Sequence, residues 1–391
     1  MLADYITDRS LGLLEDPDGN LRALESRLEQ FCGEIRANPV DESDEHAATR
    51  IYVQRLAEAG LLDLVVPSAY GGANTRVSAT QICVARQWLA RESGALDTAF
   101  VMQGLGSFPL VLANEESLAR QVLPKIRTGE LISGFAITEP EAGSDVSNMK
   151  THAEVRGDTI RISGMKWFIS NAGVAHGYSV FARERASDPD ADPIYSAFWV
   201  PADTPGVRVV PQQVIAPHPI GEVHFDNVEI PFGHRIGAPG QGLKIALGNL
   251  DQFRPTVGAA ALGIADRAFT CALDHLSQRV QFGKPLAKQQ GLRFAMAELA
   301  TAHTAAQLLV YRAAGARDRD AADSAQVAMG KLFATETAQQ VVDRAVQCLG
   351  GRGVTVGEVP ERLYREVRAL RIYEGTSEIQ KLVIARALFP R

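Results

Sequence analysis

Apolar residues recur along the first third of the chain at the spacing of amphipathic helices. Leu21, Leu24, Leu28, Phe31 and Ile35 follow one another at steps of three and four residues, which places them on one stripe of a helix. The same kind of pattern predicts further helices over about 46–62, 76–93 and 116–128. We therefore expect a helical N-terminal region.

Beyond Leu131 the pattern changes to short alternating runs that are typical of strands. One pair of runs, 153–155 and 160–162, flanks Gly157-Asp158, which suits a two-residue hairpin turn. Further runs of this kind follow, separated by prolines and glycines, at 178–182, 195–200 and 222–230. These runs predict a central β domain.

The helical spacing returns near Gly242 and continues almost to the C-terminus. Blocks of helices, then strands, then helices indicate an α+β fold rather than alternating βαβ units. We expect a helical domain over 1–131, a β domain over 132–238 and a helical region over 239–391.

Composition narrows the class of protein. Hydrophobic residues make up 46% of the 391 residues and charged residues 22%, as in an ordinary globular protein with a large core. The net charge of −6 offers no basic field for nucleic acid or an anionic membrane. The cysteines are scattered and form no Cys-x-x-Cys pair, which argues against disulfides and zinc and favours a reducing, cytoplasmic location.

The sequence shows no clear signal for secretion, membrane insertion or metal binding. The first residues, Met1 to Arg9, lack a basic start followed by an apolar run, so we expect no secretory signal. No uncharged apolar stretch approaches the roughly 20 residues of a spanning helix. The histidines show no metal-ligand spacing, and His218, His224 and His234 are interpreted as structural or exposed.

Two segments of the β domain carry candidate chemistry. Phe135 to Asp145 is a loop that offers backbone N–H groups and the hydroxyls of Thr138 and Ser144 to an anion or a polar ring edge. An ordinary turn between strands is an equal alternative. Lys166 to Asn171 places adjacent aromatics and a hydroxyl on a strand, which suits either a flat cofactor or a hydrophobic core.

Two further segments lie near the C-terminus. Leu349 to Gly353 is no dinucleotide fingerprint, because it follows a helix and Val356 stands where the last glycine belongs. In Arg371 to Gln380, Gly375 permits a close backbone approach, and Thr376 or Ser377 can cap a following helix with Glu378 in its first turn. Glu374 at this helix entrance suits a general base or a surface acid.

Together and in order, these segments resemble the acyl-CoA dehydrogenase family. The motifs that carry the resemblance run from the Tyr70-Gly-Gly loop to the C-terminus. They are Thr138-Glu-Pro-x-Ala-Gly-Ser-Asp145, Phe225-Asp-Asn-Val-Glu-Ile-Pro231, Arg279-x-Gln-Phe-Gly-Lys284, Gln347-x-x-Gly-Gly-x-Gly353 and Ile372-Tyr-Glu-Gly-Thr-Ser-Glu-Ile-Gln380.

The resemblance implies an N-terminal helical domain, a central β domain and a C-terminal four-helix bundle, with FAD between the last two. It also implies a homo-oligomer, a dimer or more commonly a tetramer, in which the cofactor reaches across a dimer interface. The implied cofactor-binding residues are Phe135, Ile137, Thr138, Gly143, Ser144, Phe168, Ile169, Ser170, Arg279, Phe282, Gln290, Gln347, Gly350, Gly351, Thr376, Ser377 and Glu378. The implied substrate contacts are Ser144, Asp251, Arg254, Tyr373 and Gly375.

The implied chemistry is α,β-dehydrogenation of an acyl-CoA in fatty acid metabolism. Glu374 would take the α-proton, flavin N5 would accept the β-hydride, and the Glu374 N–H with a ribityl hydroxyl would stabilise charge on the thioester oxygen. An electron-transferring flavoprotein would take the electrons. An acyl-CoA oxidase, a dehydrogenase of acyl-carrier-protein thioesters and a non-catalytic flavoprotein are the alternatives; the intact Glu374 motif argues against a related monooxygenase.

A few positions depart from the family pattern. Phe168 stands where tryptophan is common, Ser170 where threonine is frequent, Asn148 where a small residue is usual, and Gly357 where an acid is frequent. These differences leave the acyl group undefined. Some branches carry the base at the position of Phe253, and phenylalanine cannot accept a proton.

Overall fold

The computed structural model describes residues 19–185 and 192–389. The segment Met1 to Arg9, on which the expectation about a secretory signal rests, lies outside these residues. The chain forms two compact units. Of the described residues, the β unit contains those within Val40–Ser78 and Thr98–Asp251, and the helical unit contains 19–39, Ala79–Asp97 and 252–389.

The β unit is built on one mixed sheet with the strand order β6-β7-β3-β2-β4-β5-β8, and β1 pairs in parallel with β4. The strands are β1 (Ser133–Ala136), β2 (His152–Arg156), β3 (Thr159–Ser170), β4 (Gly177–Glu184), β5 (Ile194–Pro201), β6 (Val207–Pro211), β7 (Ile220–Pro231) and β8 (Arg235–Ile236). The predicted Gly157-Asp158 hairpin is confirmed, because Arg156 of β2 faces Thr159 of β3. Alternate apolar residues of β3 and β7, such as Ile160, Ile162, Val223 and Phe225, enter a common core.

An irregularity in β3 shapes the surface of this sheet. The pairing of β3 with β7 shifts register between Lys166 and Ile169, so that Trp167 and Phe168 bulge out of the ladder. The Trp167 N–H is instead bonded to the Thr138 carbonyl at 2.8 Å. A bulge of this kind redirects side chains, and here it brings the two candidate segments of the β domain together.

Short helical segments complete the β unit: α3 (Glu45–Glu58), η2 (Leu61–Val65), η3 (Ser68–Tyr70), α6 (Glu116–Arg127), η4 (Val146–Asn148) and η5 (Phe232–His234). The helix expected over 46–62 ends at Glu58, because Gly60 adopts a left-handed φ of 66° and the chain continues as a 3₁₀ turn. Such a glycine is a common helix stop.

One helix was not predicted from the sequence. The helix α5 (Gly94–Leu112) was missed, since a helix covered on most sides has no polar stripe. By length and composition alone, both α5 and α7 (Gly242–Gln278) could cross a membrane, but each carries charged residues, so neither is an uncharged apolar stretch. Both have 78% of their apolar window buried inside the structure, which is the environment of core helices.

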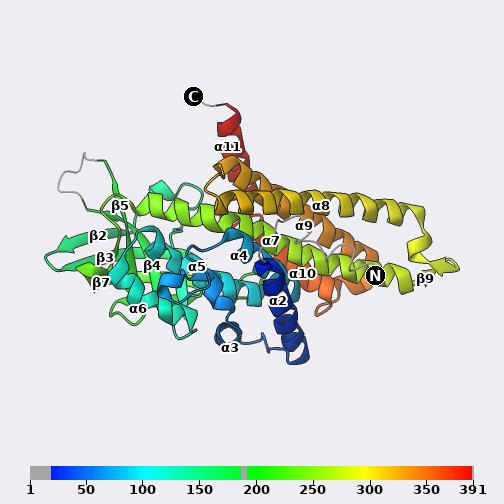
Figure 1. The fold of residues 1–391 in the computed structure, drawn as a ribbon, viewed down its shortest axis with the longest axis horizontal. Helices are drawn as coiled ribbons and strands as arrows, with labels where there is room; N and C mark the ends of the chain where they lie inside the picture. The colour runs from blue at the N-terminus through cyan, green and yellow to red at the C-terminus, as the bar shows by residue number, and fades with distance from the viewer. Residues whose placement is uncertain (1–18, 186–191, 390–391) are drawn as a thin grey trace. The chain divides into compact units, whose positions relative to one another are not determined.

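The helical unit contains α2 (Asn20–Ala37), α4 (Ala79–Glu92), α8 (Gln290–Asp318), α9 (Ser324–Leu349), α10 (Val359–Leu370) and α11 (Ser377–Leu388), with η6 (Leu286–Lys288) and η7 (Gly350–Val354). The helices α8 and α9 run side by side (Figure 1). A core of alanine, valine and leucine side chains joins α7, α9 and α10. A small hairpin, β9 (Val280–Gln281) and β10 (Lys284–Pro285), follows α7.

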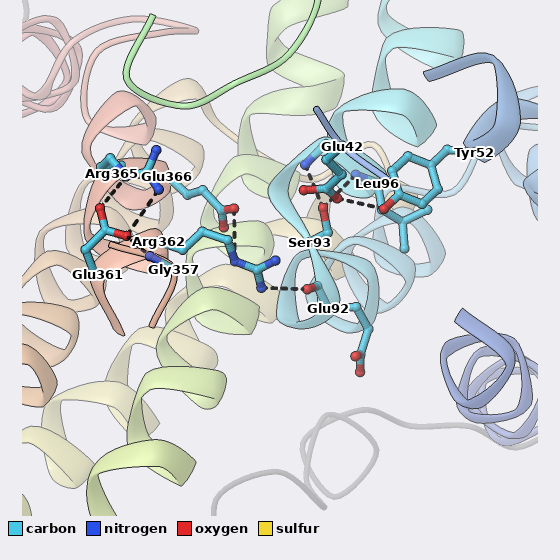
Figure 2. A network of polar contacts seen from close by, with 11 residues as sticks. Glu42, Tyr52, Glu92, Ser93, Leu96, Gly357, Glu361, Arg362, Arg365 and Glu366 are labelled. Carbon is cyan, nitrogen blue, oxygen red and sulfur yellow. Dashed lines mark hydrogen bonds and ion pairs between the residues drawn. The ribbon is translucent and has the colours of Figure 1, made fainter. Parts of the chain in front are cut away.

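Polar contacts fix α10 within the helical unit (Figure 2). Arg362 donates from Nη2 to the Glu92 carbonyl at the end of α4, at 3.0 Å, and its Nε lies 3.6 Å from Glu366. Arg365 and Glu361 form an ion pair one turn apart on α10, at 2.7 Å. Since the candidate base follows directly on α10, these contacts also set where it lies.

Candidate active site

Glu374 lies in a tight reversal between α10 and α11. Both Glu374 and Gly375 have left-handed backbone conformations, with φ of 53° and 91°. The φ of 91° at Gly375 is a conformation that residues with a Cβ rarely adopt, and a Cβ there would also lie 2.6 Å from Nε2 of Gln380, so the position favours glycine. Thr376 then caps α11 by accepting from the Ile379 N–H at 3.3 Å, and Glu378 stands in the first turn, as predicted.

Three side chains hold this reversal through its carbonyl oxygens. The Gly375 carbonyl accepts from Lys331 Nζ and from Gln380 Nε2, each at 2.8 Å. The Glu374 carbonyl accepts from Arg254 Nε at 3.3 Å. Within the described part of the chain the Glu374 N–H donates to no protein acceptor. It therefore remains available to an oxygen of a bound molecule.

The Glu374 carboxyl is in an unusual electrostatic environment. The residue is partly exposed, but its Oε2 atom is buried and has no hydrogen-bond partner among residues 19–185 and 192–389. Burial raises the pKa of this carboxyl, and the nearby charges of Arg86, Arg254 and Lys331 lower it by less. A desolvated carboxylate without a direct partner is suited to accept a proton.

The charges around Glu374 are largely committed to other partners. Arg86 donates to both carboxylate oxygens of Asp97, at 2.8 and 2.6 Å, and this pair is buried. Burial lowers the pKa of the Lys331 ammonium to about 8, against the attraction of Glu374. Burial likewise raises the pKa of the Tyr373 hydroxyl. Glu374 thus lies near three cations without forming an ion pair with any of the described residues.

Sequence reasoning missed Arg86, Lys331 and Gln380. A usable signal existed for Lys331, which is a single cation on the buried face of α9, two residues after Met329 and three before Ala334. A lone lysine at such a position requires a partner. Its partner, the Gly375 carbonyl, lies 44 positions away in the sequence and could not be inferred from spacing.

In the β unit, a buried ion pair joins the two candidate segments. Lys166 Nζ donates to Glu139 Oε1 at 2.7 Å and to the Ile137 carbonyl at 3.0 Å. Glu139 also accepts from the N–H groups of Lys150, at 2.6 Å, and Thr151, at 3.0 Å. The loop that begins at Thr138 and the bulge at Trp167 are therefore held in one fixed arrangement.

The bulge exposes a flat aromatic surface. Phe168 has a left-handed φ of 54°, and 48% of its surface is exposed. Its ring stacks on Trp167 with centroids 4.3 Å apart and planes 29° apart. A bulky residue in this backbone conformation is uncommon and marks sites where a ligand is bound. Next to it, Ser170 Oγ lies 3.1 Å from Nε2 of His218.

The other predicted contacts of the β unit divide into two groups. Phe135 and Ile137 are buried, and the Phe135 ring packs 5.0 Å from Phe181, so their side chains belong to the core and only their backbones can meet a ligand. Ile169 is buried as well. Gly143 and Ser144 are exposed, and a Cβ on Gly143 would touch nothing within 4 Å.

The predicted residues for the far end of the cofactor all lie on the surface of the helical unit. Phe282, at the tip of the β9–β10 hairpin, is 92% exposed with a φ of 51°. Gly350 ends α9 with a φ of 60°, and a Cβ on Gly351 would meet nothing within 4 Å. Position 353 requires glycine for packing, because a Cβ there would lie 2.2 Å from the Val346 carbonyl oxygen. Three further exposed members are Arg279, Gln290 and Gln347.

The remaining predicted contacts have mixed environments. Ser377 is buried and donates to Glu336 at 2.6 Å. Arg254 is buried against the Glu374 carbonyl, which makes it part of the support of the candidate base. Asp251 lies one helical turn before it on α7 and is partly exposed. Their contacts with a substrate stay predictions.

These features suit a flavin. An exposed aromatic pair can lie against a planar ring, glycines without neighbouring atoms admit a close phosphate or ring, and a buried unpaired carboxylate can face a reacting carbon. By contrast, no cluster of histidine, cysteine or acidic residues suited to a metal ion was found among the residues that the structure describes.

Comparison with known proteins identifies the family. Three family models match consecutive parts of the chain: the acyl-CoA dehydrogenase N-terminal domain over 20–130, the middle domain over 134–228 and the C-terminal domain over 240–389. The probable acyl-CoA dehydrogenase FadE25 of Mycobacterium tuberculosis is 36% identical over 392 aligned residues, covering 97% of this chain and 99% of that protein.

Solved structures agree with this result. One, reported as the electron transferring flavoprotein of Acidaminococcus fermentans, has a TM-score of 0.89 at 32% identity and covers 96% of this chain and 99% of that chain. An acyl-CoA dehydrogenase complexed with FAD from Bacillus anthracis has a TM-score of 0.87 at 26% identity, covering 98% and 71%. The chain belongs to the acyl-CoA dehydrogenase family and is an oxidoreductase that acts on CH–CH bonds.

Proposed function

We propose that this enzyme, with FAD as its cofactor, dehydrogenates an acyl-CoA thioester between the α and β carbons to the trans-2-enoyl-CoA, with Glu374 as the base. The observation that carries the proposal is the Glu374 carboxyl, whose Oε2 atom is buried without a hydrogen-bond partner in the described chain and whose pKa is raised by burial. Such a group gains a proton readily near neutral pH.

The residues around Glu374 support the same reaction. Lys331, Gln380 and Arg254 hold the two carbonyls of the reversal, so the carboxyl is presented from a rigid backbone. The Glu374 N–H can donate to the thioester oxygen, where negative charge develops as the α-proton leaves. FAD, when bound, supplies the two-electron acceptor for the β-hydrogen. The three cations near Glu374 favour its ionised form before the reaction.

The reduced enzyme must pass its two electrons to an acceptor before the next turnover. An electron-transferring flavoprotein is the acceptor that we propose, and the similarity to the Acidaminococcus structure supports it. An acyl-CoA oxidase would instead reduce oxygen, and a carrier-protein-linked enzyme would take another thioester. The buried, unpaired Glu374 argues against a purely binding or scaffolding flavoprotein, because such a carboxyl costs stability without a compensating contact.

A panel of acyl-CoAs tests the proposed function. The purified protein should be yellow, should release FAD rather than FMN on denaturation, and should lose its flavin absorbance when a straight, branched or cyclic acyl-CoA is added without oxygen. Hydrogen peroxide in air would identify an oxidase. Failure of every acyl-CoA and every acyl-carrier-protein thioester to bleach a bound, chemically reducible flavin would refute the proposal.

We further propose that the protein is a homo-oligomer and that its state in solution is a tetramer. The residues expected at the adenylate end of FAD are exposed in the isolated chain, among them Phe282, which is 92% exposed, and Gly351. A symmetric interface would use each such surface twice. Light scattering of the FAD-loaded protein is expected to give at least a dimer, and Phe282→Ser is expected to weaken FAD retention. A monomer that binds FAD fully would contradict this expectation.

A further inference from the structure

His218 is bonded to a predicted cofactor residue, although its sequence context suggested no role. It lies in the connection between β6 and β7, and its Nε2 is 3.1 Å from Ser170 Oγ at the end of β3. Its other ring nitrogen, Nδ1, is 2.9 Å from the Ala216 carbonyl. Ser170 follows the exposed Phe168 by two positions, so this pair stands beside the aromatic surface that suits a flavin.

The two contacts of His218 determine which atom carries the hydrogen. A carbonyl oxygen only accepts, so Nδ1 must carry the ring hydrogen in its bond to Ala216. In the neutral imidazole, Nε2 is then an acceptor, and Ser170 must donate its hydroxyl hydrogen to it. Ser170 has one hydrogen only. With that hydrogen committed to His218, its oxygen presents lone pairs alone to a third partner.

The neutral ring is the form that its surroundings favour. Burial lowers the pKa of His218, and the Ala216 carbonyl raises it by less. No charged group of the described residues contributes to this shift, from β3, from β7 or from the 212–219 connection. At neutral pH the hydroxyl of Ser170 is therefore fixed in direction. Protonation reverses the bond, since Nε2–H then donates to Ser170 and frees the hydroxyl hydrogen.

We propose that His218 is a positioning residue that makes Ser170 a hydrogen-bond acceptor toward the isoalloxazine ring, and that protonation of His218 turns Ser170 into a donor. This inference rests on the proposed function, which places FAD beside Ser170. The polar edge of an oxidised isoalloxazine is rich in acceptors, whereas reduction by two electrons adds N–H. A Ser170 that can only accept therefore favours the reduced over the oxidised cofactor.

Three variants test the inference through the reduction potential of bound FAD, measured with a chemical reductant and a reference dye. His218→Leu removes the acceptor and releases the Ser170 hydrogen. His218→Gln keeps an acceptor for Ser170 and an N–H for Ala216, but does not titrate. His224→Gln is the matched control, because His224 is bonded at 2.7 Å to Glu222 on β7. Since the reductant is chemical, the measurement does not depend on whether any acyl-CoA is a substrate.

At pH 8 we expect the ratio of the affinities for reduced and oxidised FAD to be about tenfold smaller in His218→Leu than in the wild type. This change lowers the reduction potential of the two-electron couple by about 30 mV. His218→Gln and His224→Gln should match the wild type. As the pH falls through the lowered pKa of His218, the wild type should approach His218→Leu, because the ring becomes protonated, while His218→Gln should keep its preference. Equal potentials in wild type and His218→Leu at pH 8 would overturn the inference.

A second measurement keeps the inference testable if His218→Leu folds poorly. Nitrogen-15 NMR of labelled histidine in the wild-type protein reports the tautomer of His218 directly. We expect a neutral ring with hydrogen on Nδ1 at pH 7. Hydrogen on Nε2 would overturn the inference while leaving the proposed dehydrogenation intact. The proposed dehydrogenation itself fails only if no acyl thioester bleaches the flavin.

Discussion

Glu374→Gln is expected to retain FAD and bind acyl-CoA but to lose flavin reduction. Glutamine has nearly the same shape and keeps the backbone N–H, yet it cannot accept the α-proton. Loss of a general base typically costs about 10²–10⁴-fold in rate. The loss is expected at or above the upper end, because Asp97, a buried carboxylate whose charge acts on Glu374, is paired with Arg86. Anaerobic stopped-flow bleaching by the best acyl-CoA of the panel measures this rate.

The matched control is Glu298→Gln, which removes an exposed carboxylate from α8. It should bleach like the wild type. The wild-type rate should also rise with pH through the pKa of Glu374, which burial raises, because only the ionised carboxylate takes a proton. Glu374→Gln should lack this rise. Bleaching of Glu374→Gln within threefold of the wild-type rate would show that another group is the base.

The second large effect is expected at the buried pair of the β unit. Lys166→Met leaves Glu139 without its cation in a site where both side chains are at most 6% exposed. Removing one partner of a buried ion pair typically costs about 3–5 kcal/mol in the free energy of unfolding. The apoprotein should therefore unfold at a clearly lower denaturant concentration, and FAD binding should weaken because the Thr138 loop and the Trp167 bulge lose their common support.

Two further variants separate the ion pair from a general effect of losing a lysine. Lys150→Met removes a cation from the ion pair with Glu141, whose side chains are 70% and 67% exposed, and it should change stability little. The double variant Glu139→Gln with Lys166→Met should recover part of the loss, because no uncompensated charge remains buried. Equal unfolding transitions for Lys166→Met and Lys150→Met would contradict the proposed role of the pair.

The sequence was most informative where chemistry and local structure share one short segment. Glu374, Gly375 and Thr376 are consecutive, so a helix cap, a glycine turn and a candidate base could be predicted together, and the cap and turn are confirmed. The strands with a regular alternation were likewise predictable, because period-two burial leaves a direct trace in the sequence.

What could not be predicted depends on contacts between distant segments. His218 and Ser170 are 48 positions apart, and nothing in either segment marks the other as a partner. The parallel pairing of β1 with β4 places the Phe135 ring against Phe181, a contact that the sequence pattern does not reveal, and the contact of Phe135 with the cofactor stays a prediction. The helix α5 was overlooked because burial on most sides removes the periodicity that reveals a helix.

The raised pKa of Glu374 determines which substitutions at this position would stabilise the fold. A carboxyl whose pKa is raised by folding stabilises the fold fully only below its unfolded pKa, and this contribution is lost as the pH rises through the folded pKa. At neutral pH the ionised Glu374 thus opposes folding, as does its left-handed φ of 53°. Selection for thermostability alone should therefore favour neutral residues or glycine at position 374. Directed evolution of this protein for stability should therefore include an activity screen at every round, because stability is gained most easily by replacing the proposed base.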